Sequence, residues 1–160
     1  RRDQSHFPKK PFLKADPVVR LKFLDRLENY PRPWIGIAWN SRHGRLDVGQ
    51  LLKKLEPMGG TRFNLQYGEK DDRLVDIQPD PLEDMEGHLN FISCLDRMVS
   101  VTQTVVHEAG ALGIPCDVIK PPKGSGDVDP ALWYYGIGDC KHLVYGGVNV
   151  FQSIESYKPL

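Results

Sequence analysis

The chain has 160 residues, of which 40% are hydrophobic and 26% are charged, as expected for one compact domain with a hydrophobic core. Basic and acidic residues number 21 each, so no net charge would attract nucleic acid or an anionic membrane surface. A site for an anion would therefore have to be built locally.

The cysteines and the hydropathy pattern indicate the compartment. Cys94, Cys116 and Cys140 are odd in number and too far apart for a CxxC pair, which argues against a disulfide framework or a zinc knuckle. No run approaches the roughly 20 apolar residues of a membrane span. The basic start leads into no apolar signal region. We therefore expect a cytoplasmic protein without a membrane span, and no pattern implies a metal or a cofactor.

The first part of the chain divides into a lead-in and the start of a domain. Residues 1–15 lack periodicity and are predicted to be an extended linker, whereas residues 16–160 are predicted to form a single domain. Asp16 and Pro17 form an N-cap and first-turn pair, which predicts a helix that ends before Pro31.

Beyond this helix, predicted strands and helices alternate. A nearly continuous apolar run at residues 34–39 is typical of a strand that is buried on both faces. Further strands are predicted at residues 62–67, 74–77, 98–101, 116–119 and 143–145. Helices are predicted to begin at Val48, at Asp80 with Pro81, and just after Gln103. This alternation predicts an α/β fold with a Rossmann-like, doubly wound and mostly parallel sheet, whose ligands bind outside the carboxyl ends of the strands.

The first candidate site lies where the strand at residues 98–101 ends and a helix begins. Thr102, Gln103 and Thr104 offer hydroxyl and amide groups there, and His107 lies one turn into the helix. The first backbone N–H groups of a helix lack partners, and the helix dipole favours an anion such as a phosphate group at that end. Simple helix capping, which needs no ligand, is the alternative interpretation.

Two more polar groups follow predicted strands. Asn40, Ser41 and Arg45 belong to the loop after residues 34–39, and the planar fork of an arginine suits a diphosphate. A solvated surface loop explains the same composition. Gln66 could hydrogen-bond the edge of a base or ribose, and Tyr67 could stack on a base, although an aromatic residue at the end of a strand also fits a core position.

Taken together, these segments resemble the glycosyltransferases that are often fused to tetratricopeptide repeats and are similar to the bacterial heptosyltransferases. The resemblance spans most of the chain and is carried by residues 12–17, 35–39, 64–68, 95–101 and 107–115 and by the pair Trp133-Tyr134. Its most specific part is the stretch from Leu95 to Pro115, which is similar to the donor-phosphate loop and the helix that follows it in that family.

The resemblance implies the C-terminal, donor-binding half of a GT-B fold, in which two Rossmann-like domains face each other across a cleft. The implied ligand is a nucleoside-diphosphate sugar, from which a hexose or heptose is transferred. The residues implied to surround the diphosphate or line the cleft are Thr102, Gln103, Thr104, His107, Ser41, Arg45 and Gln66. The catalytic base is implied to lie on an N-terminal acceptor domain or a partner chain, so we expect this chain to be inactive alone.

One position departs from the family pattern. Where the family commonly has Asp-Thr at the start of the donor-phosphate loop, this chain has Thr102-Gln103, which removes a carboxylate and shifts the hydroxyl by one residue. This departure supports an alternative hypothesis, a non-catalytic module of the same fold that binds carbohydrate, a protein partner or a second copy of itself.

Overall fold

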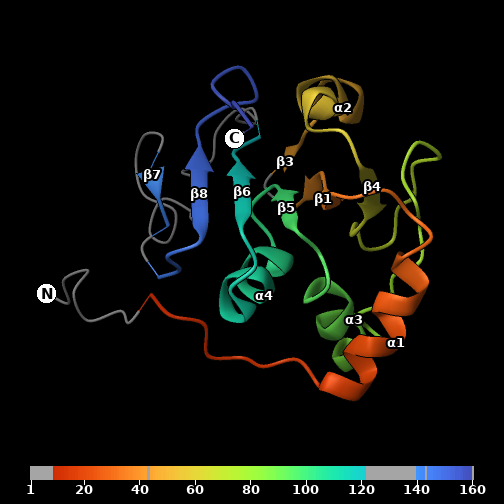
Figure 1. Cartoon of the computed structure of the whole chain (residues 1–160). Helices are drawn as coiled ribbons and strands as arrows, with labels where there is room; N and C mark the ends of the chain where they lie inside the picture. Colours follow the sequence, from red (N-terminus) through yellow and green to blue (C-terminus); the bar gives the residue numbers. More distant parts are fainter. Residues whose placement is uncertain (1–8, 43, 122–139, 143, 160) are drawn as a thin grey trace, which may run out of the picture.

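The computed structural model describes residues 9–42, 44–121, 140–142 and 144–159. Within these residues the chain forms an α/β fold with helices on both faces of a six-stranded sheet (Figure 1). The parallel strands are β1 (Trp34–Ala38), β4 (Thr61–Asn64), β5 (Arg97–Ser100), β6 (Cys116–Ile119) and β8 (Val148–Phe151). The edge strand β7 (Cys140–Lys141) is antiparallel to β8. The Rossmann-like, doubly wound prediction is confirmed.

The strand order decides where a ligand can bind. The order across the sheet is β4-β1-β5-β6-β8-β7. Numbered along the chain, the parallel strands therefore run 2-1-3-4-5, and the direction of winding reverses between β1 and β5. At such a switch point the connections leave on opposite faces of the sheet, which opens a crevice at the carboxyl ends of the two strands.

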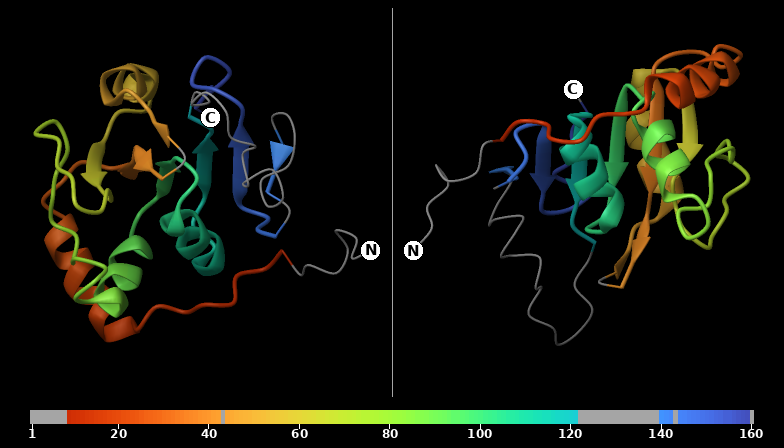
Figure 2. Two further views of the ribbon diagram at one scale, coloured as in Figure 1. Left: turned by 180° about the vertical axis from the view of Figure 1, so that it is seen from behind. Right: turned by 90° about the horizontal axis from the view of Figure 1, so that it is seen from below.

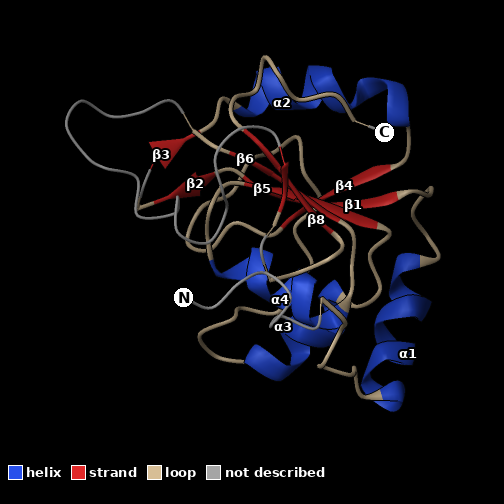
Figure 3. Cartoon of the chain, turned by 90° about the vertical axis from the view of Figure 1, so that its left-hand side faces the viewer, coloured by secondary structure: helices blue, strands red, loops and turns tan. Residues whose placement is uncertain are grey.

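The helices divide between the two faces of the sheet, as Figure 3 shows. They are α1 (Pro17–Leu27), α2 (Val48–Leu55), α3 (Met85–Ile92) and α4 (Thr104–Leu112), with the 3-10 turn η2 (Glu56–Met58) after α2. On one face α1, α3 and α4 pack over Trp34, Met98 and Val118. On the other face α2 and the C-terminal segment, including Tyr157, pack over Ile37. Side chains on both faces of β1 are buried under these elements, which explains why the sequence of β1 is continuously apolar.

The predicted start of α1 is confirmed. Asp16 is the N-cap, and one of its carboxylate oxygens accepts hydrogen bonds from the backbone N–H groups of Val18 (2.8 Å) and Val19 (3.0 Å). The end of α4 is also confirmed, because Gly113 adopts the left-handed conformation (φ +80°) that terminates many helices.

Three predicted elements are wrong. The strand at residues 74–77 is reduced to one bridge between Val75 and Phe63. The residues after Asp80 form only a turn, and α3 begins at Met85 because Asp84 caps it by accepting a 2.8 Å hydrogen bond. No strand covers residues 144 and 145, and the sheet is completed instead by β8, whose buried and half-buried side chains alternate.

Two other predictions need adjustment. The loop at residues 40–45 contains a short antiparallel pair, β2 (Asn40–Ser41) and β3 (Gly44–Arg45). The segment before α1 runs close to α4 (Figure 2), and the backbone N–H groups of Phe12 and Leu13 donate to the carbonyl of Ala111. The pair Trp133-Tyr134, part of the family resemblance, lies outside the described residues.

Candidate functional site

The switch point brings two of the predicted site segments together. Ala38 of β1 pairs with Ser100 of β5, and the N–H of Val101 donates to the carbonyl of Ala38 (3.0 Å). Asn40 and Thr102 each lie two residues beyond that pair, so they meet at the same edge of the sheet. The hairpin after β1 and the start of α4 therefore lie next to each other at the switch point, and their role in ligand binding stays a prediction.

A carboxylate that the sequence analysis did not select organises the hairpin. Glu69 lies 2.8 Å from the guanidinium of Arg45 through one carboxylate oxygen and accepts a hydrogen bond from the side-chain amide of Asn40 through the other. The hydroxyl of Ser41 is 3.5 Å from the carbonyl of Gly44. Glu69 thereby holds two predicted ligand-binding side chains in place and neutralises part of the charge of Arg45.

Gln66 fixes the point where β1 turns into the hairpin. Its side-chain oxygen accepts hydrogen bonds from the backbone N–H groups of Trp39 (3.0 Å) and Asn40 (2.8 Å), and its amide nitrogen donates to the carbonyl of Tyr67 (3.3 Å). The side chain is buried. Gln66 therefore positions the hairpin, and hydrogen bonding of a base or ribose by Gln66 stays a prediction.

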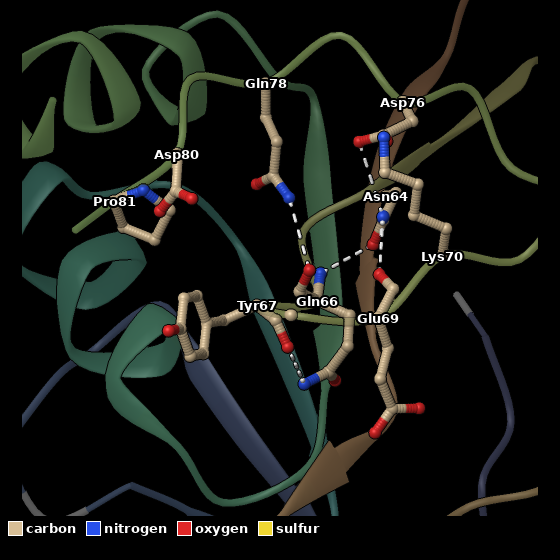
Figure 4. Close-up of a pocket in the computed structure, with 10 residues that line it drawn as sticks. Asn64, Gln66, Tyr67, Glu69, Lys70, Asp76, Gln78, Asp80 and Pro81 are labelled. Carbon is tan, nitrogen blue, oxygen red and sulfur yellow. Dashed lines mark hydrogen bonds and ion pairs between the residues drawn. The ribbon is translucent and has the colours of Figure 1, made fainter. Parts of the chain in front are cut away.

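A pocket of about 280 Å³ opens beside this hairpin (Figure 4). Its lining residues come from the end of β4 and from the segment between β4 and α3, and they are Asn64, Gln66, Tyr67, Gly68, Glu69, Lys70, Asp76, Gln78, Asp80 and Pro81. Tyr67 is 51% exposed, so the alternative of a core aromatic is wrong and a ring face is accessible for stacking.

The charges of this pocket select against a phosphate group. Asp76 pairs with Lys70 (2.6 Å), and this hydrogen bond raises the pKa of the Lys70 ammonium. Glu69 and Asp80 add further carboxylates to the lining. The amides of Asn64 and Gln66 present neutral hydrogen-bonding groups. Such a lining suits a neutral ligand group, such as a base or a sugar, better than an anion.

The N-terminus of α4 differs from those of the other helices. The side chains of Asp16, Asp47 and Asp84 each accept a hydrogen bond from the first turn of α1, α2 and α3. Gln103 caps α4 without such a bond, and its amide lies 3.4 Å from the hydroxyl of Ser100. The first N–H groups of α4 are therefore not satisfied by the cap side chain, which favours anion binding over simple capping.

The two threonine hydroxyls at the start of α4 differ in their exposure to solvent. Thr104 is exposed, whereas Thr102 is only 6% exposed. The Oγ1 atom of Thr102 is buried without a hydrogen-bond partner. A buried hydroxyl without a partner costs free energy, which makes this oxygen a prospective contact for a ligand.

The ring of His107 packs against the rings of His142 (6.1 Å between centroids) and Tyr145 (5.8 Å), in the segment that precedes β8. Desolvation lowers the pKa of His107, against the raising effect of Glu108. The imidazole is therefore neutral near pH 7 and can contribute a dipole, but no charge, to binding of a diphosphate.

A chain of buried and half-buried polar side chains links α4 to the hairpin. Glu108 Oε2 lies 3.2 Å from Nδ1 of His88, and Nε2 of that ring is 3.0 Å from the oxygen of Gln78. The amide of Gln78 in turn donates to the carbonyl of Gln66 (3.4 Å). Sequence reasoning missed these residues because they are far apart in the chain and belong to no motif. They connect α4 with Gln66, which positions the hairpin.

Among the residues that the structure describes, no group of three or more His, Cys, Asp or Glu side chains is arranged to hold a metal ion. Within the same residues, no helix has the length and apolar character needed to cross a membrane. Comparisons with protein-family models, curated proteins and solved structures find no match to the chain. The structure therefore defines an α/β protein of the Rossmann-like, doubly wound type with polar side chains at its switch point.

Proposed function

We propose that this chain is the donor-binding domain of a glycosyltransferase that uses a nucleoside-diphosphate sugar. The observation that carries the proposal is the meeting, at the switch point, of a helix N-terminus without a side-chain cap and a polar hairpin. The sequence resemblance to heptosyltransferase-like enzymes supports the same function.

The site offers different chemistry to the two parts of such a ligand. The start of α4 and Arg45 suit the diphosphate, because N–H groups and a guanidinium stabilise an anion. The pocket at Tyr67 suits a neutral group, because its carboxylates would repel phosphate. Stabilisation of the departing diphosphate by fixed donors would assist loss of the leaving group.

Turnover needs groups beyond those of this site. Of the three carboxylates that line the pocket, Glu69 pairs with Arg45 and Asp76 pairs with Lys70. The third, Asp80, accepts a hydrogen bond from the backbone N–H of Leu82 (2.9 Å). The proposal therefore assigns donor binding to this chain and the catalytic base to an acceptor domain or a partner chain.

Isothermal titration with UDP, GDP, ADP and CDP tests the proposal. We expect at least one of them to bind, and Tyr67→Ala to weaken that binding about fivefold or more through loss of base stacking. Phe12→Ala is the matched control, because Phe12 is also an exposed aromatic but stacks on Tyr145. The absence of binding by every nucleoside diphosphate would overturn the proposal. Binding of free sugars alone would favour the non-catalytic carbohydrate-binding module.

A further inference from the structure

A buried lysine lies at the carboxyl end of β6. Lys120 is only 6% exposed, and its Nζ lies 3.3 Å from the side-chain oxygen of Gln152. Lysine is rarely buried to this extent, because its charge must be compensated when it leaves water. No motif in the sequence singles out this residue.

The alternation of side chains along β6 places Lys120 on the face that α4 covers. Cys116 and Val118 belong to the apolar cluster that α1, α3 and α4 cover, whereas Ile119 belongs to the cluster beneath α2. The N–H of Lys120 donates to the carbonyl of Phe151 (2.9 Å), so the extended backbone of β6 continues to this residue. Successive side chains of a strand point to opposite faces, so that of Lys120 follows Cys116 and Val118.

The register of β5 and β6 places Lys120 and Thr102 at the same end of two neighbouring strands. Ser100 pairs with Val118, and Thr102 and Lys120 each lie two residues beyond that pair, just past the last residues of β5 and β6. The chain turns into α4 immediately after Thr102. A buried ammonium, a buried hydroxyl without a partner and the first turn of α4 therefore lie at the same end of the sheet, next to the switch point.

These three groups share one electrostatic preference. The N-terminus of a helix carries a partial positive charge, and the ammonium of a lysine is positive, so both attract an anion. A hydroxyl, an ammonium and helix N–H groups can all donate hydrogen bonds to one phosphate. We propose that Thr102, Lys120 and the first turn of α4 form a binding site for a phosphate group, with Lys120 as its cation. The identity of the natural ligand rests on the proposed function, whereas phosphate binding at this site does not.

The test uses inorganic pyrophosphate as the probe, titrated calorimetrically into the wild-type chain and two variants. Loss of a charge-assisted hydrogen bond in Lys120→Met is expected to raise the Kd about tenfold or more. Lys22→Met removes the same charge from an exposed position on α1 and is expected to leave the Kd unchanged. Lys120→Arg keeps a positive charge and should retain part of the binding.

Thr102→Val separates a ligand-binding role from a structural one. Valine has nearly the same shape and removes the hydroxyl without a partner, so the urea midpoint of this variant is expected to equal or exceed that of the wild type. Its Kd for pyrophosphate is expected to rise about threefold or more. A Thr102 hydroxyl that serves only the fold would give the opposite pattern, with lower stability and unchanged binding.

The outcomes distinguish this inference from the proposed function. Pyrophosphate binding that is absent, or equal in the wild type and in both Lys120→Met and Thr102→Val, overturns the phosphate site. Nucleoside diphosphate binding that survives both substitutions also overturns it, while leaving donor binding intact. Lys120-dependent binding of pyrophosphate, with no binding of any nucleoside diphosphate, supports the phosphate site and rejects the donor role.

Discussion

His142 is a buried histidine that should make the stability of this protein depend on acid pH. It is 1% exposed, and desolvation, reinforced by the neighbouring His107, lowers its pKa from 6.5 to about 4. The geometry gives a further reason. Nδ1 accepts hydrogen bonds from the backbone N–H groups of Val144 (3.0 Å) and Tyr145 (3.3 Å), and a proton on that nitrogen would break both.

The sign and the size of the effect follow from this shift. The unfolded chain binds a proton at this histidine below pH 6.5, whereas the folded chain does not bind it until about pH 4. The contribution of His142 is therefore fully present above pH 6.5 and is lost as the pH falls toward 4. A difference of about 2.5 pKa units corresponds to about 3 kcal/mol of unfolding free energy.

The variant His142→Asn measures this term, because an asparagine side-chain oxygen can accept the same backbone hydrogen bonds without titrating. Urea unfolding of both proteins at pH 7.5 and at pH 4 gives a double difference in which the titration of the carboxylates largely cancels. We expect the advantage of the wild type over the variant to shrink by about 3 kcal/mol at the lower pH. Unfolding free energies that fall in parallel for the two proteins would refute the reasoning.

Two further predictions concern a buried ion pair and a tight turn. Asp117→Leu is expected to lower the unfolding free energy by about 3–5 kcal/mol, because the guanidinium of Arg97 loses a buried carboxylate 3.3 Å away, and a loss below about 1 kcal/mol in urea would contradict this. Gly60→Ala is expected to destabilise more than Gly59→Ala in thermal unfolding. Both glycines have positive φ, but a Cβ at Gly60 would lie 2.1 Å from the carbonyl oxygen of Pro33, whereas a Cβ at Gly59 meets nothing within 4 Å. Equal losses of thermal stability in the two variants would contradict this prediction, because they would mean that the structure relieves the clash with Pro33.

The sequence pattern was sufficient to predict an element where that pattern is compatible with one local structure only. The apolar run of β1 predicts a strand that is buried on both faces, and Asp16 followed by Pro17 predicts the start of α1. Thr102 and Gln103 lie between a strand and a helix, as expected. These elements depend on neighbours in the sequence, so a single segment contains the information.

Local signals failed where two of them compete or where the partner is distant. Asp80 and Asp84 are both good cap residues, and only packing decides that α3 starts after the second. β8 contains a polar residue, Asn149, whose side chain donates to Asp117 of β6 (2.8 Å). That bond joins residues 32 positions apart, and the pattern of neither segment reveals it.

The candidate site shows the same division between segments and their assembly. Alternating strands and helices determined, from the sequence alone, that polar residues such as Asn40 and Thr102 would lie at the carboxyl edge of a parallel sheet. Only the tertiary structure decided that Glu69 holds Arg45, and that the ends of β5 and β6, which precede Thr102 and Lys120, are neighbours in the sheet. The physical reason is that local periodicity sets which face and which end of a strand a residue occupies. Neighbours across strands depend on strand order and register, which arise from packing of the whole chain.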